Sequence, residues 1–123
     1  MTLTFRELSR VNRERCEAPD GFDHPVEGWS LSDWMLAATG EFGEAANVAK
    51  KLRRLDLALP NKEAGLTRSD AEPLKEKLAE ECADTIIYAL LLMSLMGVNA
   101  SSVIERVFDR KSVEYGFPER ARG

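Results

Sequence analysis

The pattern of apolar and polar positions along the chain predicts an all-α protein with four helices. Apolar residues recur at steps of three and four in four segments, which is typical of helices that bury one face. We expect these helices at about Phe5 to Cys16, Ser30 or Ser32 to about Leu55, near Ser69 to Gly97, and Asn99 or Ser101 to the residue before Gly116. Strand signals are weak, since the sequence has no convincing alternating run and no Asn-Gly or Asp-Gly turn.

Local signals support the helix boundaries. Thr4 with Glu7, and Ser69 with Glu72, match the capping box in which a hydroxyl and a glutamate satisfy the first free amides of a helix. Gly97 is suited to end the third helix. The segment from Glu17 to Gly28 contains two prolines and two further turn-forming glycines, so we expect an ordered loop there.

The connection from Asp56 to Arg68 is long for a compact helical bundle. It carries Pro60, Asn61 and Gly65, which disfavour a continuous helix. Connections of this length are usually functional or mobile, and we expect a mobile loop at about 56–68.

The second half of the third helix, IIYALLLMSLM at 86–96, is apolar around its whole circumference. Such a helix has to be buried on every side. Four helices in one small chain hardly achieve this, so we expect a homodimer or homotetramer that packs on this helix. The alternative is a helix at the centre of a monomer.

Size and composition narrow the class of protein. The chain has 123 residues and a mass of 13.7 kDa, which fits a single domain over 1–123. A net charge of −4 disfavours sequence-independent binding to nucleic acid. The longest apolar run has eleven residues, whereas a membrane span needs about 20. With no apolar leader segment visible, we expect a cytoplasmic protein.

Histidine and cysteine are too scarce for most metal sites. The two cysteines, Cys16 and Cys82, are far apart in sequence, which excludes a disulfide framework and a thiolate zinc site. His24 is the only histidine, which excludes zinc chemistry of the HExxH type. Any metal bound by this chain would therefore have mostly oxygen ligands.

Two carboxylate pairs coincide with the apolar stripes of helices. In the second helix the stripe reads Trp34, Ala37, Ala38, Glu41, Ala45, Val48, Leu52, and in the third it reads Leu74, Leu78, Glu81, Thr85, Tyr88, Leu92. Glu41 and Glu81 thus take core positions. Glu44 and Asp84 each lie one turn further on. Two helices are therefore expected to direct acidic pairs toward the interior.

Burying ionised carboxylates without partners costs several kcal/mol, and four together repel one another. No Arg or Lys lies in either stripe near the acids to neutralise them. A divalent cation with all-oxygen ligation, Mg²⁺ or Mn²⁺, resolves this conflict. The alternatives are that the acids face water at the open end of the bundle, or that they pair with arginines of the first or last helix.

Candidate substrate contacts surround these acids. The helix face through Glu44 continues with Asn47, Lys51 and Arg54, whose side chains can donate to anionic oxygens. A solvated basic helix end that favours the helix dipole is the equal alternative. Arg110 and Lys111, near the end of the last helix, could likewise either bind anionic oxygens of a substrate or form a solvated basic helix end.

Aromatic residues near the second helix could stack on a base. Trp29 lies in the loop that precedes the helix and is the better pocket candidate. Trp34 lies on the apolar stripe, which favours core packing, and His24 is more often simply exposed. Cys82 is expected to pack as a small apolar residue.

The segments GEFGEAANVAKK at 40–51 and KLAEECADTIIYALLLMSLMGVN at 77–99 resemble the MazG-like, all-α nucleoside triphosphate pyrophosphohydrolases. The family signature is E-x-x-E on one helix and E-x-x-D on the next, matched here by Glu41/Glu44 and Glu81/Asp84. The ending FDRKSVEYGFPER at 108–120 also looks like the closing helix of that family.

The resemblance implies a four-helix MazG-like bundle completed by homo-oligomerisation. It implies Mg²⁺-dependent hydrolysis of a nucleoside triphosphate to the monophosphate and pyrophosphate, either for housecleaning of damaged nucleotides or for control of the nucleotide pool. The four acids would be the metal ligands, and Glu41 or Glu44 would accept the proton of the attacking water. Lys51 and Arg54 could stabilise the departing pyrophosphate.

The chain departs from the family at two places. The 36 residues between Glu44 and Glu81 exceed the usual spacing. Asp109 stands where relatives often carry an Asn that helps to hold the nucleotide, and an ionised carboxylate cannot donate a hydrogen bond. Two other readings stay open: a non-enzymatic helical interaction module, and a related hydrolase of the dUTPase or phosphoribosyl-ATP pyrophosphohydrolase type.

Overall fold

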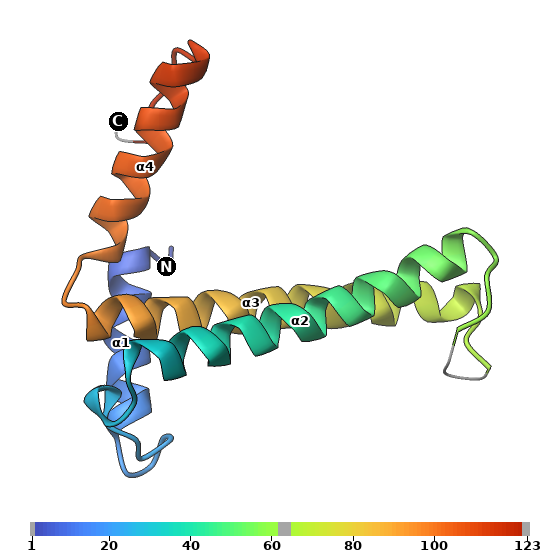
Figure 1. Cartoon of the computed structure of the whole chain (residues 1–123), viewed down its shortest axis with the longest axis horizontal. Coiled ribbons are helices and arrows are strands. Elements are labelled where there is room, and N and C mark those ends of the chain that lie inside the picture. Colours follow the sequence, from blue (N-terminus) through green and yellow to red (C-terminus); the bar gives the residue numbers. More distant parts are fainter. Residues whose placement is uncertain (1, 62–64, 122–123) are drawn as a thin grey trace. The chain divides into compact units, whose positions relative to one another are not determined.

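The described part of the chain, residues 2–61 and 65–121 of a computed structural model, contains helices and no strand. The elements are α1 (Phe5–Glu17), η1 (Val26–Gly28), α2 (Leu31–Asp56), η2 (Arg68–Asp70), α3 (Ala71–Leu95) and α4 (Ala100–Tyr115). The prediction of an all-α chain with four α-helices is confirmed, and the bounds of α1, α2 and α4 lie within one or two residues of those expected from the sequence (Figure 1).

Side-chain caps set the helix starts. The Thr4 hydroxyl accepts a hydrogen bond of 3.1 Å from the amide of Glu7, as the sequence indicated. The capping box expected from Ser69 and Glu72 is wrong, because Thr67 and Asp70 form the box two positions earlier. A 3-10 turn follows this box, and α3 therefore begins at Ala71.

The start and the end of α4 are both set by the residues expected from the sequence. The Asn99 side chain accepts from the amide of Ser102 at 3.1 Å and caps the start of α4. Gly116 has φ of 72°, and its amide bonds back to the last turn of α4. A left-handed residue at this place favours glycine, which has no Cβ to clash with the preceding carbonyl.

The chain divides into two compact units. The hairpin unit is Ser32–Ala89 and contains most of α2 and α3, which run side by side (Figure 1). The second unit combines Met1–Leu31 with Leu90–Gly123 and contains α1, η1, the end of α3, and α4. All four predicted metal ligands belong to the hairpin unit.

The core of the hairpin unit follows the stripe expected on α2. The residues of α2 that are buried are Trp34, Ala38, Ala45, Val48 and Leu55. Trp34 is 2% exposed, and its ring lies against that of Tyr88 from α3, with centroids 6.2 Å apart. Core packing of Trp34, favoured by its stripe position, is confirmed.

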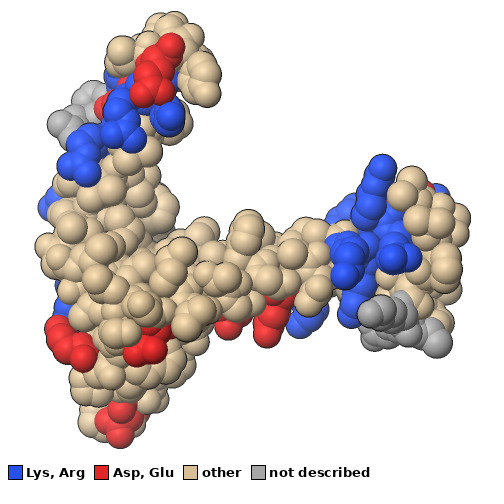
Figure 2. Space-filling model, viewed as in Figure 1, with Lys and Arg blue, Asp and Glu red and all other residues tan. Residues whose placement is uncertain are grey.

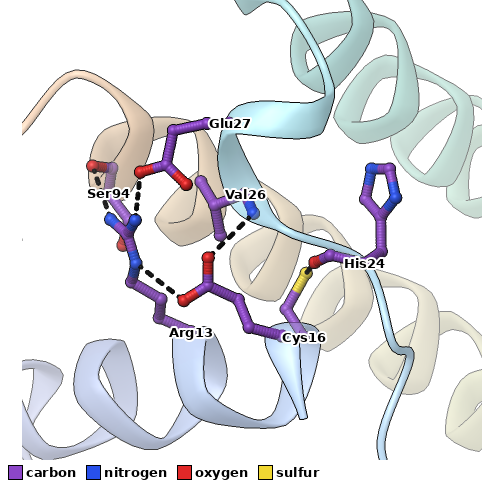
Figure 3. Close-up of polar contacts among 7 residues, drawn as sticks. Arg13, Cys16, His24, Val26, Glu27 and Ser94 are labelled. Atoms are coloured by element: carbon purple, nitrogen blue, oxygen red, sulfur yellow. Dashed lines mark hydrogen bonds and ion pairs between the residues drawn. The ribbon is translucent and has the colours of Figure 1, made fainter. Parts of the chain in front are cut away.

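In the second unit, Arg13 of α1 fastens the loop before η1 (Figure 3). Its guanidinium pairs with Glu27, donates to Glu17 at 3.2 Å and donates to the carbonyl of Ser94 at 3.3 Å. Glu17 in turn accepts from the amide of Val26 at 3.0 Å. The expected ordered loop is therefore held by charge-assisted hydrogen bonds to three segments of this unit.

One position of this loop depends on glycine for space. A Cβ at Gly21 would lie 1.9 Å from the backbone carbonyl oxygen of Arg15, far inside van der Waals contact. The same carbonyl accepts a hydrogen bond of 3.0 Å from the amide of Phe22. Gly21 thus allows the loop to return tightly against the last turns of α1.

The apolar half of α3 is only partly buried within the chain. Leu90 and Leu91 are almost fully buried, but Ile86 keeps 47% of its surface exposed and Met96 keeps 50%. Burial on every side, expected from the sequence, is thus not reached by the described residues of one chain. No single described helix is both long and apolar enough to cross a membrane. The segments Arg68–Leu95 and Ala100–Tyr115 meet those criteria only as a pair, with a sharp bend at the break between them.

The connection between α2 and α3 starts with a compact reversal. The Leu59 amide donates to the carbonyl of Arg54 at 2.8 Å, and the Arg54 guanidinium donates to the carbonyl of Pro60 at 2.9 Å. Ala58 takes a left-handed conformation with φ of 54° between these two contacts. The expected mobile loop at about 56–68 includes positions 62–64, which lie outside the described residues.

Candidate metal centre

Three of the four predicted ligands meet between α2 and α3. Glu41, Glu44 and Glu81 each place one carboxylate oxygen so that the three atoms lie within 4.8 Å of one another. We call these three residues the acidic cluster. Asp84, the fourth predicted ligand, has an exposed side chain and is not part of this set. Both acids of the E-x-x-E motif, Glu41 and Glu44, therefore belong to the acidic cluster. Of the E-x-x-D motif, only Glu81 does.

Burial within the acidic cluster is graded. Glu81 is 7% exposed, Glu41 is half-buried and Glu44 is exposed. The Oε2 atom of Glu81 is buried and has no hydrogen-bond partner among the described residues. An unpartnered buried carboxylate oxygen is costly, because the charge loses its hydration without receiving a donor in exchange.

A lysine from outside the apolar stripes approaches the other oxygen of Glu81, a partner that the stripes alone do not predict. Lys77 is one turn before Glu81 on α3, and its Nζ lies 3.5 Å from Oε1. The lysine side chain is 58% exposed and the glutamate side chain 10%. The i, i+4 spacing of Lys77 and Glu81 was the signal in the sequence, since residues four apart lie on one helix face.

The environment of Glu41 opposes its ionisation. Burial raises the pKa of Glu41 first, followed by the hydrogen-bonding approach of the Glu81 carboxyl and the negative charges of Glu44, Asp84 and Glu81. Protonated Glu41 can donate to Glu81, whereas two ionised carboxylates only accept. Without a cation, the acidic cluster therefore tends to retain a proton.

The donor set fits a hard divalent cation. Three carboxylate oxygens from two helices, one of them buried and without a donor, match the all-oxygen ligation that Mg²⁺ and Mn²⁺ prefer. Glu44 and the nearby Asp84 are exposed, so a cation held here could keep contacts with water or with substrate oxygens. The match between the acidic cluster and a divalent cation thus depends on two properties: all ligand atoms are carboxylate oxygens, and three of them lie close together.

Beyond the acidic cluster, α2 becomes basic toward its C-terminal end. Figure 2 shows Lys and Arg side chains gathered at the end of the hairpin where α2 leads into the connection to α3. The residues of α2 there are Lys50, Lys51, Arg53 and Arg54. Lys51 is half-buried, and lies seven positions after Glu44, or about 10 Å along the helix. Asn47, between them, is exposed.

The other predicted substrate contacts have structural partners of their own. Arg54, about 15 Å along the helix from Glu44, donates to the carbonyl of Pro60 and so also supports the reversal after α2. In the second unit, Asp109 accepts from the amide of Ala121 at 2.7 Å, and Lys111 pairs with Glu114 at 3.2 Å. These two side chains therefore make contacts within α4 and the segment that follows it.

The loop aromatics form a pair in the second unit. The rings of His24 and Trp29 meet edge to face with centroids 4.9 Å apart, and 38% of the Trp29 surface is exposed. Both residues lie outside the hairpin unit that carries the acidic cluster. Stacking of a base on Trp29 stays a prediction.

An apolar groove adjoins the acidic cluster, and the sequence reasoning did not identify it. It has a volume of about 200 Å³ and is lined by Phe42, Ala45, Ala46, Ala49, Leu78 and Cys82. Phe42 is 63% exposed, and the thiol-bearing Cys82 is exposed rather than packed in a core. Because Phe42 follows Glu41 and Cys82 follows Glu81, a partner seated in this groove would lie beside the acidic cluster.

Comparisons with known proteins add no relative. No protein family model matches the chain, and no curated protein or solved structure matches it either. The resemblance to the MazG-like enzymes therefore rests on the acidic motifs and their surroundings in the sequence.

Proposed function

We propose that this chain is a Mg²⁺-dependent nucleoside triphosphate pyrophosphohydrolase of the MazG-like type. The observation that carries the proposal is the convergence of Glu41, Glu44 and Glu81 within 4.8 Å, with a buried oxygen of Glu81 that lacks a donor. The Lys77 ion pair and a proton retained on Glu41 offset only part of the repulsion among three carboxylates, whereas a divalent cation would compensate all three. Mg²⁺, or Mn²⁺ in its place, is the cofactor that the oxygen ligands favour.

The reaction adds water across the α–β phosphoanhydride and yields a nucleoside monophosphate and pyrophosphate. A bound Mg²⁺ would neutralise phosphate charge and lower the pKa of water. Glu41 and Glu44 are the candidates to accept the proton that the water loses on attacking phosphorus. Exposure favours Glu44 over Glu41, because the oxygens of Glu44 are reachable from solvent while Glu41 is half-buried.

The basic end of α2 supplies the binding of the triphosphate. Lys51 lies about two helical turns from Glu44 on the same helix, so its ammonium can approach phosphates that are anchored near the acidic cluster. Asn47 lies between them and can donate from its amide. Lys51 would thereby stabilise the negative charge that grows on the departing pyrophosphate.

The test is pyrophosphate release from a panel of canonical and modified nucleoside triphosphates in the presence of Mg²⁺. We expect release by the wild-type chain, and a loss of turnover by orders of magnitude in Glu41→Gln and Glu81→Gln. Glu80→Gln, an exposed neighbour on α3, is the matched control and should retain turnover. Absence of release by the wild-type chain, or full turnover in both cluster variants, would contradict the proposal and favour a non-enzymatic helical module.

We also propose that the chain works as a homodimer or homotetramer that completes the bundle. In the hairpin unit, Phe42 and Ile86 are exposed at 63% and 47%, and the groove beside Phe42 is apolar. Gly43 adds to this argument, since a Cβ there would meet nothing within 4 Å beyond the adjacent residues and backbone of α2 itself. A glycine within a helix costs up to about 1 kcal/mol relative to alanine, and packing within the described chain does not require one at this position.

A further inference from the structure

We propose that Lys77 is an exchangeable counterion of the acidic cluster: it holds Glu81 when no metal is bound, and moves to an anionic oxygen of the substrate when a divalent cation takes its place. This inference rests on the proposed function, because it requires a cation at Glu81. Lys77 belongs to neither acidic motif and to neither apolar stripe. Its assignment comes from its contact with Glu81 alone.

The contact joins an exposed charge to a buried one. The Lys77 side chain is 58% exposed, whereas the Glu81 side chain is 10% exposed, and Nζ lies 3.5 Å from Oε1. Strong charge-assisted hydrogen bonds between ammonium and carboxylate are about 2.7–2.9 Å long. The Lys77 contact is therefore an ion pair without a tight hydrogen bond, and it can be broken without opening the core of the hairpin.

Charge makes the lysine and a metal ion competitors. Glu81 offers only two oxygens: Oε1 faces the ammonium, and Oε2 is buried with no partner among the described residues. A divalent cation on this carboxylate would lie a few ångströms from Nζ, at a distance where like charges repel strongly in a partly buried site. Metal binding therefore has to displace the Lys77 ammonium.

The displaced ammonium keeps its place beside the acidic cluster. Lysine carries its charge on a flexible four-carbon stem, so Nζ can turn outward while Cα stays fixed on α3. A triphosphate held at the acidic cluster presents anionic oxygens on the solvent side, where Lys77 is already exposed. Lys77 would then bind phosphate from α3, opposite the basic residues of α2.

The experiment measures Mn²⁺ binding to the full chain by calorimetry and by electron paramagnetic resonance, with no nucleotide present. Lys77→Met removes the ammonium and keeps an unbranched side chain that is one atom shorter. We expect Lys77→Met to bind Mn²⁺ about two- to fivefold more tightly than the wild type, since the lost ion pair no longer opposes the metal. Lys77→Arg keeps the charge and should bind close to the wild-type affinity.

The matched control is Lys75→Met. Lys75 lies on the same helix, is 61% exposed, and pairs with Glu72 at 3.0 Å, so it is a lysine of the same kind away from the acidic cluster. We expect its Mn²⁺ affinity to equal that of the wild type. Steady-state kinetics with the best triphosphate should show a raised KM in Lys77→Met and an unchanged KM in Lys75→Met.

Exchange predicts that Lys77→Met changes metal affinity and substrate affinity in opposite directions. A structural role of Lys77 would weaken both metal and substrate binding, whereas exchange strengthens the first and weakens the second. An unchanged or weaker Mn²⁺ affinity in Lys77→Met, or an unchanged KM, overturns the exchange and leaves the proposed function standing. If the wild-type chain binds no Mn²⁺, or binds it equally after Glu81→Gln, the proposed function fails and the exchange fails with it.

Discussion

The carboxyl groups of Glu41 and Glu81 face each other from neighbouring helices, and Glu44 completes a trio of oxygens within 4.8 Å. Each of the two glutamates takes an apolar position in the pattern of its helix. Folding thus brings like charges together at a point where hydrophobic side chains would stabilise the hairpin more. The charges of the acidic cluster therefore lower the stability of the metal-free hairpin.

Removing the buried charge should stabilise the metal-free protein. Glu81→Gln keeps the shape of the side chain, removes the charge from a position that is 7% exposed, and adds an amide donor beside Glu41. We expect the free energy of unfolding by urea, measured with a chelator at neutral pH, to rise by about 1 kcal/mol. Glu80→Gln, which is exposed, should leave it unchanged.

The same variant should lose stabilisation by metal. At a Mn²⁺ concentration of about 100 times Kd, the wild type should gain roughly 2.7 kcal/mol over its metal-free state. Glu81→Gln should gain much less. A variant that is less stable than the wild type in chelator and is equally stabilised by Mn²⁺ would contradict a metal role for Glu81.

Stability without metal should depend on pH through Glu41. The pKa of Glu41 is raised, so the folded state binds its proton more tightly than the unfolded state. The stability linked to Glu41 is fully present below the ordinary glutamate pKa and is lost as the pH rises through the raised value. Thermal unfolding in chelator from pH 4 to pH 8, compared between the wild type and Glu41→Gln, isolates this contribution.

We expect the difference in Tm between Glu41→Gln and the wild type to grow in favour of the variant as the pH rises. Added Mg²⁺ should reduce this difference, because a cation compensates the ionised carboxylate. A difference in Tm that is constant over the whole pH range would show that Glu41 is not perturbed by its neighbours.

The loop before η1 should depend on Arg13. Arg13→Met removes the donors to Glu27, Glu17 and the carbonyl of Ser94. We expect a loss of about 1–2 kcal/mol in the free energy of unfolding, because the half-buried acceptors at Glu17 and Ser94 lose charge-assisted bonds. Arg10→Met is the control: Arg10 also makes two ion pairs on α1, but it is 56% exposed, and its loss should cost clearly less than the loss of Arg13. Equal effects of the two variants would contradict the role assigned to Arg13.

Assembly should depend on the groove beside the acidic cluster. Phe42→Ser removes the most prominent apolar side chain that lines the groove, and we expect it to shift the mass measured by light scattering toward the monomer. Met35→Ser changes another exposed apolar residue of α2, outside the residues that line the groove, and should have a smaller effect. A wild-type chain that is monomeric at all concentrations would contradict the homo-oligomer.

Local rules predicted most of the fold. The helix starts at Thr4 and Asn99 and the stop at Gly116 depend on side-chain caps and a left-handed glycine, which short sequence patterns encode. The start of α3 was misplaced because Thr67/Asp70 and Ser69/Glu72 both fit the capping box and overlap. The choice between them depends on how the preceding segment approaches the helix, and no local pattern contains that information.

The site was predictable as far as helix periodicity determines it. The stripes place Glu41 and Glu81 on buried faces, and the spacing of three brings Glu44 alongside. Periodicity does not determine how far each side chain extends, so the exposure of Asp84 appears only in three dimensions. The i, i+4 spacing places Lys77 and Glu81 on one helix face, and the structure adds that their charged groups meet. The contact between Arg13 and Ser94 joins residues 81 positions apart and likewise leaves no mark in the pattern.

The most direct test of the account is an anomalous-scattering map from crystals of the full chain grown with Mn²⁺. We expect one or more manganese peaks within coordination distance of Glu41, Glu44 and Glu81, with the Lys77 ammonium turned away from Glu81. A map with no manganese at these three side chains, at Mn²⁺ concentrations that saturate binding in solution, would contradict the central claim that the acidic cluster is a metal centre.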